Sequence, residues 1–411
     1  MNRKHVVSWA FYDFAGSIYS AVIAAAVFNV YFANVIVGNA DGRGDQIWGW
    51  VGSVSVAIVA LTSPLLGSVA DRAGVRKRLM LVYTLLGVVA VGFFTTLKPG
   101  MVWVGFALAV LANLGFEGGQ VFYNAYLPDI APKSHQGRVS GWGFGLGYLG
   151  SAAGLLAAIP LASAGRFDLL WIFVAAWWLL FSLPAFTMLP EAPGTGDSLG
   201  VAAMKGITDF RRIFREVMAE RELRRFLISF FFYIDGVLTV IWFAAIFASE
   251  TLQFDQQETI VLFLVVQLSA LAGSFAMAKP TDVLGPKKII MAMLVLWSSV
   301  AIAAYFVTSK SVFFGIAVVA GIGLGSIQAA SRSFMSALIP EGKEAEMFGF
   351  YAFCGKSSSI IGPIVFGTVS RVTGGNQRLA VVAIAAFFIV GGVLLARVAD
   401  PLADAPVRAA G

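Results

Sequence analysis

The sequence predicts an all-α membrane protein, with twelve transmembrane helices arranged as two six-helix bundles. Of the 411 residues, 58% are hydrophobic and only 13% are charged, which is about half the charged fraction of a soluble domain. In addition, the pattern Asp-x-x-Gly-x-basic-basic occurs twice, beginning at Asp71 and at Asp282, and the two copies lie about half the chain apart. This separation indicates an internal duplication, and parallel six-helix repeats are a known plan of membrane proteins.

The individual helices follow from hydropathy, because a spanning helix needs about 20 predominantly apolar residues. Short polar turns separate most of the apolar stretches. The exception is the long, basic segment 191–223, which we expect to be a cytoplasmic linker between one bundle at 1–190 and another at 224–411. The twelve predicted spans are 8–37, 47–70, 79–97, 101–127, 138–162, 170–189, 224–248, 257–278, 288–307, 311–338, 346–370 and 377–397.

The linker contains a further pattern, in which apolar residues recur at helical spacing among arginines. This spacing gives one apolar helical face. We expect an amphipathic helix lying on the inner leaflet, with a solvated linker helix as the alternative. The apolar residues are Ile207, Phe210, Ile213, Phe214, Val217 and Met218.

The distribution of Lys and Arg predicts the orientation. With the N-terminus in the cytoplasm, 21 of the 29 basic residues fall on the cytoplasmic side and six on the opposite side, and Arg332 and Lys356 lie within predicted helices. Cytoplasmic loops carry such an excess, so both termini are expected inside a multi-pass protein of the cell (inner) membrane. Basic loops facing anionic headgroups also account for the net charge of +6, so we expect no nucleic-acid partner.

The few cysteines and histidines argue against an enzyme or a metal protein. Cys354 is the only cysteine, and the two histidines, His5 and His135, lie near predicted loops. A single cysteine excludes an internal disulfide and a thiolate metal cluster, and no nucleophile–His–acid set can be assembled. The glycine-rich stretch 349–357 ends in Gly-Lys-Ser, but it lies in an apolar helix without the strand that a phosphate-binding loop requires. We therefore expect no enzyme activity, cofactor or metal.

Each copy of the repeated motif places charges in a tight turn at the inner membrane interface. The glycine tolerates the positive φ that a tight turn requires, and the aspartate can pair with a base or cap a neighbouring helix. We predict that the copies act as gating latches, the second weaker because Val283 replaces the arginine; the alternative is a role in topology alone. The latch residues are Asp71, Arg72, Arg76 and Lys77 in the first copy and Asp282, Lys287 and Lys288 in the second.

A second set of polar residues lies within the apolar helices. Spacings of three, four and seven residues put the polar side chains of the fourth predicted helix on one face. Polar groups at membrane depth are expensive and usually line a cavity or pathway, so we predict a substrate-binding or proton-coupling site; the alternative is a buried structural acid. The set is Asn113, Glu117, Gln120 and Asn124, with Gln328 at the position of the second half that matches Glu117, and Lys356 as a positive partner.

Three further ionisable residues lie nearer the cytoplasmic face. Asp13 and Asp235 follow similar aromatic segments, Phe11-Tyr12 and Phe232-Tyr233-Ile234, near the starts of the first and seventh helices. Arg332 lies close to the inner end of the tenth helix. We predict that Asp13, Asp235 and Arg332 contribute to gating, with snorkelling or helix capping as the alternative for the two acids.

These residues also carry a resemblance to a known family. The repeated motif resembles the signature loop of the major facilitator superfamily. Finer segments in both halves resemble one branch, the vacuole-effluxer-like transporters related to the yeast autophagy vacuolar amino-acid effluxer. One departure is Gly16, where the branch usually has asparagine. The segments that carry the resemblance are 8–15, 122–130, 137–141, 331–333, 338–340, 344–349 and 355–363.

The resemblance implies the major facilitator fold and secondary active transport by alternating access around a central cavity. It further implies export of a small solute, with amino acids as the best-attested cargo. Because carboxylates within the membrane commonly relay protons, Glu117 and Asp13 are the candidates for proton coupling. The expected partners are that solute and the lipid bilayer, and the protein is expected to be a monomer. Two alternatives stay open: efflux of amphipathic compounds such as lipids or drugs, in keeping with 35 phenylalanines, and a non-transporting receptor or scaffold.

Overall fold

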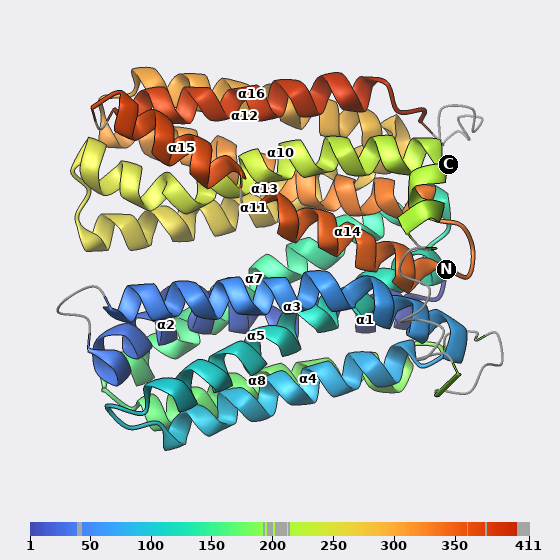
Figure 1. Ribbon diagram of the computed structural model, residues 1–411, viewed down its shortest axis with the longest axis horizontal. Coiled ribbons are helices and arrows are strands. Elements are labelled where there is room, and N and C mark those ends of the chain that lie inside the picture. The colour runs from blue at the N-terminus through green and yellow to red at the C-terminus, as the bar shows by residue number, and fades with distance from the viewer. Residues whose placement is uncertain are drawn as a thin grey trace. The chain divides into compact units, whose positions relative to one another are not determined.

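The computed structural model describes residues 1–38, 43–191, 194, 200–201, 212, 214–359, 361–374 and 376–400, and within these residues all regular secondary structure is helical (Figure 1). Twelve helical segments of this part are long and apolar enough to cross a membrane, which confirms the predicted fold class. They are Arg3–Val37, Gln46–Ala73, Arg76–Thr96, Val102–Ile130, Lys133–Ser163, Phe167–Met188, Arg221–Ala244, Val261–Leu284, Pro286–Phe306, Lys310–Leu338, Glu344–Ser370 and Gln377–Ala396.

The helix ends extend beyond several of the apolar stretches. The first span begins at Arg3 rather than at residue 8, because the Asn2 side chain accepts the backbone N–H of Lys4 and so caps the helix. A prediction from hydropathy alone misses such a polar first turn. Of the six apolar residues that predict the linker helix, three lie outside the described residues: Ile207, Phe210 and Ile213.

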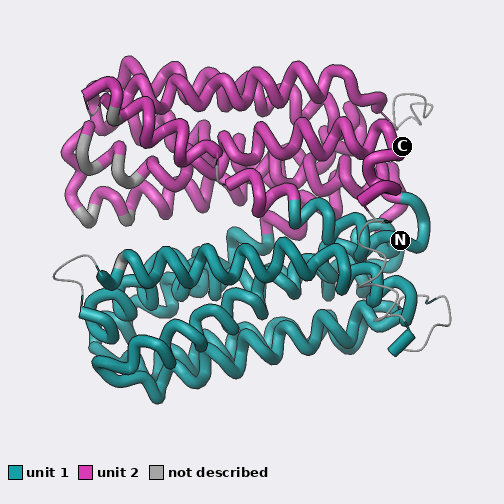
Figure 2. The backbone as a smooth tube through the Cα atoms, viewed as in Figure 1, with its two compact units in different colours: residues 1–130, 146–213, 340–353 teal, residues 131–145, 214–339, 354–411 magenta. Residues whose placement is uncertain are grey.

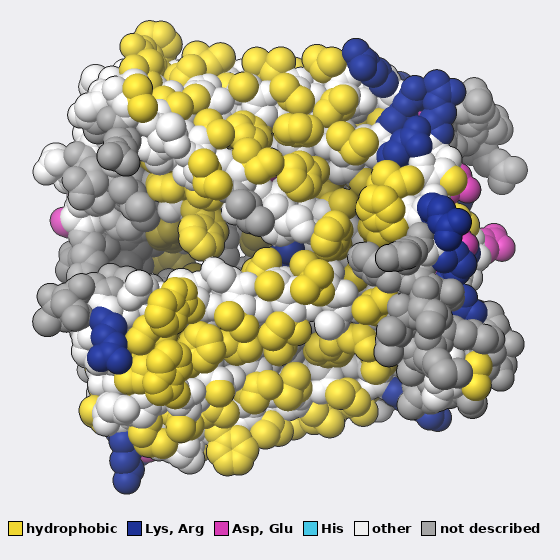
Figure 3. Space-filling model, in the orientation of Figure 1, with side chains coloured by type: hydrophobic (Ala, Val, Ile, Leu, Met, Phe, Trp, Pro, Cys, Tyr) yellow, Lys and Arg dark blue, Asp and Glu magenta, His cyan; other side chains and the backbone are white. Residues whose placement is uncertain are grey.

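The outer faces of the helices are apolar, as a lipid-embedded protein requires. Trp242, Phe306 and Val372 are each more than 70% exposed. In the face shown in Figure 3, hydrophobic side chains cover the flanks of the helices, and Lys and Arg side chains gather at the right-hand end over unit 2. Large exposed apolar residues along a helix are expected where lipid, and not water, is the solvent.

The chain divides into two compact units (Figure 2). Unit 1 comprises Met1–Ile130, Leu146–Ile213 and Pro340–Phe353. Its first span is not a uniform α-helix, because α-helical and π-helical turns alternate. Its elements are α1 (Arg3–Ile18), the π-helical η1 (Tyr19–Ala26), α2 (Phe28–Tyr31), the π-helical η2 (Phe32–Val37), α3 (Arg43–Ala73), α4 (Arg76–Phe93), η3 (Phe94–Thr96), α5 (Val102–Ala125), α6 (Leu127–Ile130), most of α7 (Gln136–Ser163), α8 (Phe167–Met188) and the first part of α14 (Glu344–Ser358).

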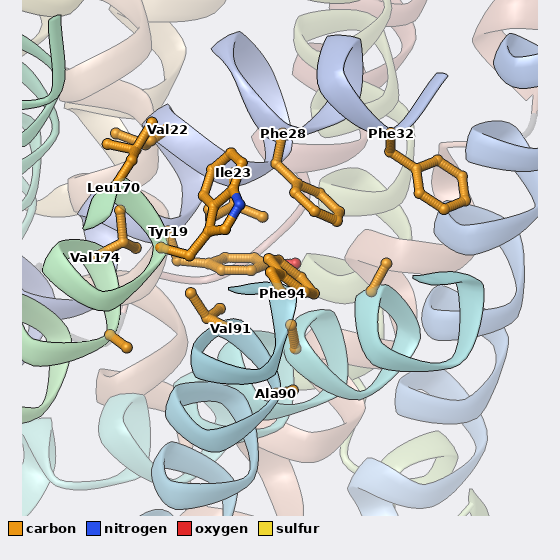
Figure 4. Packing of buried hydrophobic residues seen from close by; sticks show 14 of the residues in the cluster. Tyr19, Val22, Ile23, Phe28, Phe32, Ala90, Val91, Phe94, Leu170 and Val174 are labelled. Carbon is orange, nitrogen blue, oxygen red and sulfur yellow. The ribbon is translucent and has the colours of Figure 1, made fainter. Parts of the chain in front are cut away.

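An aromatic cluster fills the core of unit 1 (Figure 4). The rings of Phe28 and Phe94 stack with their centroids 3.8 Å apart, and Trp171 meets Phe28 edge-on at 5.2 Å. Stacked and edge-to-face pairs of this kind stabilise a core beyond the area that they bury. The cluster fixes α2 against η3 and α8.

Small residues let the helices of unit 1 approach closely. A Cβ added at Gly115 of α5 would lie 2.4 Å from the backbone nitrogen of Gly87 in α4. Close backbone approach through glycine is typical of helix packing in membranes. It accounts for part of the high glycine content of the sequence.

Unit 2 comprises Ala131–Gly145, Phe214–Ile339 and Cys354–Gly411. At its N-terminus α11 carries a capping box of Asp255 and Glu258, and Lys310 binds Glu258 at 2.6 Å. That hydrogen bond lowers the pKa of the Glu258 carboxyl. The elements are η4 (Lys133–His135), the start of α7, α10 (Arg221–Ile246), the π-helical η5 (Phe247–Thr251), α11 (Gln256–Leu284), α12 (Pro286–Phe306), α13 (Lys310–Leu338), the end of α14, α15 (Ile361–Val372) and α16 (Gln377–Ala396).

Each unit includes a short segment from the other half of the sequence. Residues 340–353, at the start of the eleventh span, belong to unit 1, and residues 131–145, at the start of the fifth span, belong to unit 2. The predicted bundles, 1–190 and 224–411, would place each segment in the opposite unit. The contacts that hold these two segments centre on the repeated motif.

Candidate functional site

The first copy of the motif surrounds a buried arginine. Only 2% of Arg76 is exposed. Its Nη2 atom lies 2.9 Å from Asp71 and 3.1 Å from Glu344, and its Nη1 atom lies 2.5 Å from Asp129. A buried guanidinium is tolerated only when carboxylates and hydrogen bonds replace its water. Arg76 therefore joins the end of α3 and the short helix α6 to the start of α14.

Asp71 also caps the start of α14. Its carboxylate accepts the backbone N–H groups of Ala345 at 3.2 Å and Glu346 at 2.9 Å. An anion at this position interacts favourably with the positive end of the helix dipole. The motif therefore binds a helix start from the other half of the sequence, as the capping role inferred for the aspartate predicts.

Two glycines allow α3 and α14 to touch. A Cβ at Gly67 would lie 2.3 Å from the carbonyl oxygen of Ala345, and a Cβ at Gly349 would lie 2.5 Å from that of Ser63. A larger residue at either position would push the two backbones apart. The turn glycine of the motif, Gly74, has φ +67°, the left-handed conformation that glycine adopts most readily.

Some partners of Arg76 lie outside the motif, so the motif alone does not predict them. Of the predicted latch residues, Asp71 and Arg76 lie together and Lys77 pairs with Glu191 at 3.0 Å. Arg72 is half-buried. Asp129 and Glu344 were not among the predicted site residues. The signal that could have found them is an acidic residue at a helix end on the same predicted membrane face as the motif.

The second copy keeps the role of the aspartate but not that of the basic residues. Asp282 accepts the backbone N–H of Arg138, in the first turn of α7, at 3.0 Å, and its carboxylate lies 3.6 Å from Arg138 Nε. Lys287 donates instead to the carbonyl oxygens of Ala396 and Val398, at the end of α16, and Lys288 is exposed. In both copies, then, the aspartate binds the first turn of a helix from the other half.

Arg332 provides a second contact to the start of α7. It is 2% exposed and donates to the hydroxyl of Ser140 at 2.9 Å and to its carbonyl oxygen at 2.6 Å. Its guanidinium lies 4.0 Å from the ring centroid of Phe144, a distance at which a cation–π interaction is favourable. Arg332 thus anchors this segment within unit 2.

The predicted polar set divides between the two units. In unit 1, Asn113, Glu117, Gln120 and Asn124 are half-buried residues of α5. The Tyr19 hydroxyl lies 3.5 Å from Asn113 Oδ1, and Gln120 Nε2 lies 3.5 Å from Asp13 Oδ1. These contacts place polar groups of α1 and η1 beside the polar face of α5.

The other members of the set, Gln328 of α13 and Lys356 of α14, are half-buried residues of unit 2. The interaction of Lys356 or Gln328 with Glu117 stays a prediction. The two units each therefore contribute polar side chains from within candidate membrane spans, on helices that are otherwise strongly apolar.

The two acids of the first and seventh spans both lie against a glycine. Asp13 is 7% exposed, and a Cβ at Gly147 of α7 would lie 3.1 Å from its Oδ2 atom. Asp235 is fully buried and accepts the backbone N–H of Gly362 at 2.8 Å. Asp235 therefore caps α15, which is one of the alternatives raised by its sequence position.

The aromatic residues before Asp13 hold α1 in place. Trp9 donates its indole N–H to the carbonyl oxygen of Tyr123 at 2.8 Å and stacks on that ring at 4.4 Å. The hydroxyls of Tyr12 and Thr84 lie 2.9 Å apart. These contacts give a physical reason for the Trp-Ala-Phe-Tyr-Asp segment.

Comparison with known families finds a match over most of the chain. Residues 47–401 match the family model described as "Vacuole effluxer Atg22 like". An "Uncharacterized MFS-type transporter YxiO" from Bacillus subtilis is 30% identical over 97% of this chain and 95% of its own length. The "Autophagy-related protein 22" of Yarrowia lipolytica is 24% identical over 77% of this chain and 69% of its own length.

Solved structures share the fold at low sequence identity. The human organic anion transporter MFSD10 (TETRAN) has a TM-score of 0.77 at 14% identity, covering 96% of this chain and 99% of its own. The proton:xylose symporter XylE has a TM-score of 0.71 at 13% identity, covering 97% of each chain. Both similarities concern the fold alone.

Proposed function

Since the chain belongs to the Atg22-like vacuole effluxer family of major facilitator superfamily transporters, we propose that it exports amino acids or similar small metabolites by alternating access. Membership in a transporter family confirms the prediction that the chain is not an enzyme. The B. subtilis relative supports a place in the cell membrane, with both termini in the cytoplasm as the Lys and Arg distribution predicts.

The observation that carries the proposal is the polar face of α5. Asn113, Glu117, Gln120 and Asn124 repeat at helical spacing within an otherwise apolar span and are half-buried rather than sealed in the core. Exposing these groups to hydrocarbon would be costly. A water-filled substrate pathway would satisfy them and would give a polar solute its hydrogen bonds.

A zwitterionic solute fits the charges of this set. Glu117 offers a negative charge for an ammonium group, and Lys356 offers a positive charge for a carboxylate. Charge-assisted hydrogen bonds are roughly twice as strong as neutral ones, so one acid and one base would select for a solute that carries both charges. Glu117 or Asp13 would take the coupling proton.

The two motif copies would act as the latches of the transport cycle. Arg76 and Asp71 bind the start of α14, and Asp282 and Arg332 bind the start of α7. Each contact joins segments from the two sequence halves, so each must break if the halves move apart on that side. Lys77, Arg72, Lys287 and Lys288 would contribute positive charge to the same membrane face.

The second candidate is efflux of amphipathic compounds. Half-buried aromatic rings of unit 1 favour it, because Phe14 stacks on Trp177 at 5.3 Å and meets Phe181 edge-on at 5.0 Å. Such rings would bind an apolar body. This reading predicts that lipids or drugs, and not amino acids, stabilise the protein.

A thermal-shift screen of the purified protein separates the two candidates. Ligands that bind only the native state raise its apparent stability by mass action. We expect neutral amino acids to raise the Tm and to exchange across proteoliposomes. Stabilisation by lipids or drugs alone, with no amino-acid exchange, would favour amphipath efflux and overturn the proposal.

Lys356→Ala tests the carboxylate contact. We expect weaker binding of zwitterionic amino acids, seen as a higher concentration for half-maximal thermal shift, while decarboxylated amines bind unchanged. Lys98→Ala, at an exposed lysine with no proposed role, is the control. Equal affinity of Lys356→Ala and wild type for amino acids would remove Lys356 from the site.

A further inference from the structure

We propose that Asp235 is a proton-binding site that controls the break in the eleventh span, and that proton binding there drives movement of α15 during transport. The proposal rests on the transport function proposed above and adds a second proton-binding residue, in addition to Glu117 or Asp13, together with the helix on which this second proton would act. It is carried by three features of unit 2: the interrupted helix, the carboxylate that caps its second part, and the close packing at Gly362.

Among the described residues, the eleventh span is not one continuous α-helix, because Ser359 lies in a turn. α14 ends at Ser358, and α15 begins at Ile361. Pro363 lies in the first turn of α15, where its missing N–H costs nothing. An interruption leaves the first N–H groups of the second helix without intrahelical partners, and in hydrocarbon each unsatisfied group costs several kcal/mol.

Asp235 supplies the missing acceptor from a different helix. Its Oδ2 atom accepts the backbone N–H of Gly362 at 2.8 Å, and its Oδ1 atom lies 3.4 Å from the hydroxyl of Thr239, one turn later on α10. Asp235 is fully buried. The negative charge is therefore held by the positive end of α15 together with these two donors.

Packing at Gly362 makes this contact specific. A Cβ at Gly362 would lie 1.9 Å from Thr239 Oγ1 and 2.6 Å from Asp235 Oδ1. Only glycine lets α15 come this close to α10, so the contact cannot persist if either helix shifts. The position of α15 and the state of the carboxylate are thus coupled.

Proton binding would weaken the hydrogen bond between Gly362 and Asp235 without changing its geometry. A neutral carboxyl can still accept the Gly362 N–H through one oxygen and donate its O–H to Thr239. The charge-assisted bond becomes an ordinary one, about half as strong, and the attraction to the helix dipole is lost. α15 is then free to leave α10, while the proton neutralises a charge that would otherwise stay in hydrocarbon.

The charged and titratable side chains described around α10 are engaged mainly at helix ends. Arg378 of α16 donates to the carbonyl oxygen of Tyr305, Lys310 of α13 binds Glu258, and Arg332 of α13 binds Ser140. Asp235 accepts the backbone N–H of Gly362 and lies 3.4 Å from the Thr239 hydroxyl. The other groups of this kind on α10 and on the described elements beside it are Arg221, Glu222, Arg224, Arg225 and Tyr233 of α10, Lys287, Lys288 and Tyr305 of α12, Cys354 and Lys356 of α14 and Arg397 after α16.

The corresponding acid of the first half lacks this arrangement. Asp13 also lies against a glycine, Gly147, but α7 runs unbroken from Gln136 to Ser163. The backbone N–H of Gly147 is therefore within a continuous helix. Because only Asp235 lies beside an interrupted helix, we assign the proton-controlled break to Asp235 and not to Asp13.

Infrared difference spectroscopy between acid and alkaline pH tests the proposal on the full-length protein in lipid vesicles. We expect a carboxylic C=O band that forms at acid pH in the wild type, is lost in Asp235→Asn, and is retained in Asp255→Asn, an exposed helix-capping acid. Should Asp235→Asn fail to fold, Asp235→Glu provides the assignment, because it moves the band. A band unaffected by either substitution overturns the proposal.

Hydrogen exchange reports the movement of the helix. After correction for intrinsic rates, amides of the 359–363 segment should exchange roughly fivefold to tenfold faster at acid pH in the wild type, as weakening a charged hydrogen bond implies. In Asp235→Asn the exchange should be fast at both pH values. Exchange that does not depend on pH in the wild type overturns the proposal.

Flux measurements separate this inference from the proposed cargo. In proteoliposomes with a mixture of neutral amino acids, Asp235→Asn should retain counterflow but lose stimulation by a pH gradient. Retained stimulation overturns the role of Asp235. If the wild type moves none of these amino acids, the proposed cargo fails, and the infrared and exchange results still decide the proton site.

Discussion

At the scale of single residues, the buried arginines are surrounded by hydrogen-bonding and charged partners. Arg76 has three carboxylates within 3.1 Å, and Arg332 has the hydroxyl and carbonyl of Ser140. Removing one member of such a set leaves the others uncompensated, which usually costs more than the intact set contributes. The gating proposed for Arg76 and Arg332 would therefore be coupled to the stability of the protein.

Arg76→Ala should lower the free energy of unfolding by about 3–5 kcal/mol, because Asp71, Asp129 and Glu344 would be left without their cation. The measurement is the denaturation midpoint in detergent. Arg78→Ala, at an exposed neighbour, is the control and should stay within about 0.5 kcal/mol of wild type. Equal midpoints for the two variants would contradict the role of Arg76.

Glu117→Gln keeps the size and hydrogen-bonding capacity of the side chain but removes its charge. We expect amino-acid transport in proteoliposomes to be lost or to become independent of the pH gradient, while the Tm of the protein is preserved. Asp168→Asn, at an exposed acid, should transport normally. Unchanged, pH-dependent flux in Glu117→Gln would exclude Glu117 from both binding and coupling.

At the scale of helices, hydropathy predicted the twelve spans but not how they are built. Over residues 3–37, α-helical and π-helical turns alternate, and a run of apolar residues does not predict this alternation. Nor does the sequence near Gly362 show that Asp235, which is distant in the sequence, accepts the backbone N–H of Gly362. Likewise, Glu344 lies 268 residues from Arg76, and no local pattern links them.

Gly67→Ala tests the contact between α3 and α14. Its Cβ would lie 2.3 Å from the carbonyl oxygen of Ala345, so the helices must separate. We expect a loss of about 1–3 kcal/mol in stability and reduced transport. Gly52→Ala, in the same helix with nothing within 4 Å of its Cβ, is the matched control. A Gly67→Ala protein as stable and active as this control would refute the contact.

At the scale of the whole molecule, the sequence predicted the fold class, the family and a repeated motif with a shared role for its aspartates. It did not predict that residues 131–145 and 340–353 would each belong to the unit of the other half. Hydropathy locates helices one at a time. The grouping of segments into units depends on side chains such as Asp71 and Asp282, whose partners are distant in the sequence and close only in the folded chain.

The orientation of the chain is a prediction at this scale. With 21 basic residues assigned to one side, both termini should face the cytoplasm. A fluorescent protein fused to either end should fluoresce in a bacterial host, and alkaline phosphatase fused to either end should be inactive. Phosphatase activity at either terminus would require the opposite orientation.

The unequal surroundings of the two motif aspartates make ionic strength a way to tell them apart. The Arg138 side chain that pairs with Asp282 is 34% exposed, whereas the guanidinium beside Asp71 is 2% exposed. Dissolved ions screen exposed charges strongly and buried ones weakly. Raising the salt concentration should therefore weaken the Asp282–Arg138 pair more than the Asp71–Arg76 pair, so that the two copies of the motif respond differently to the same medium.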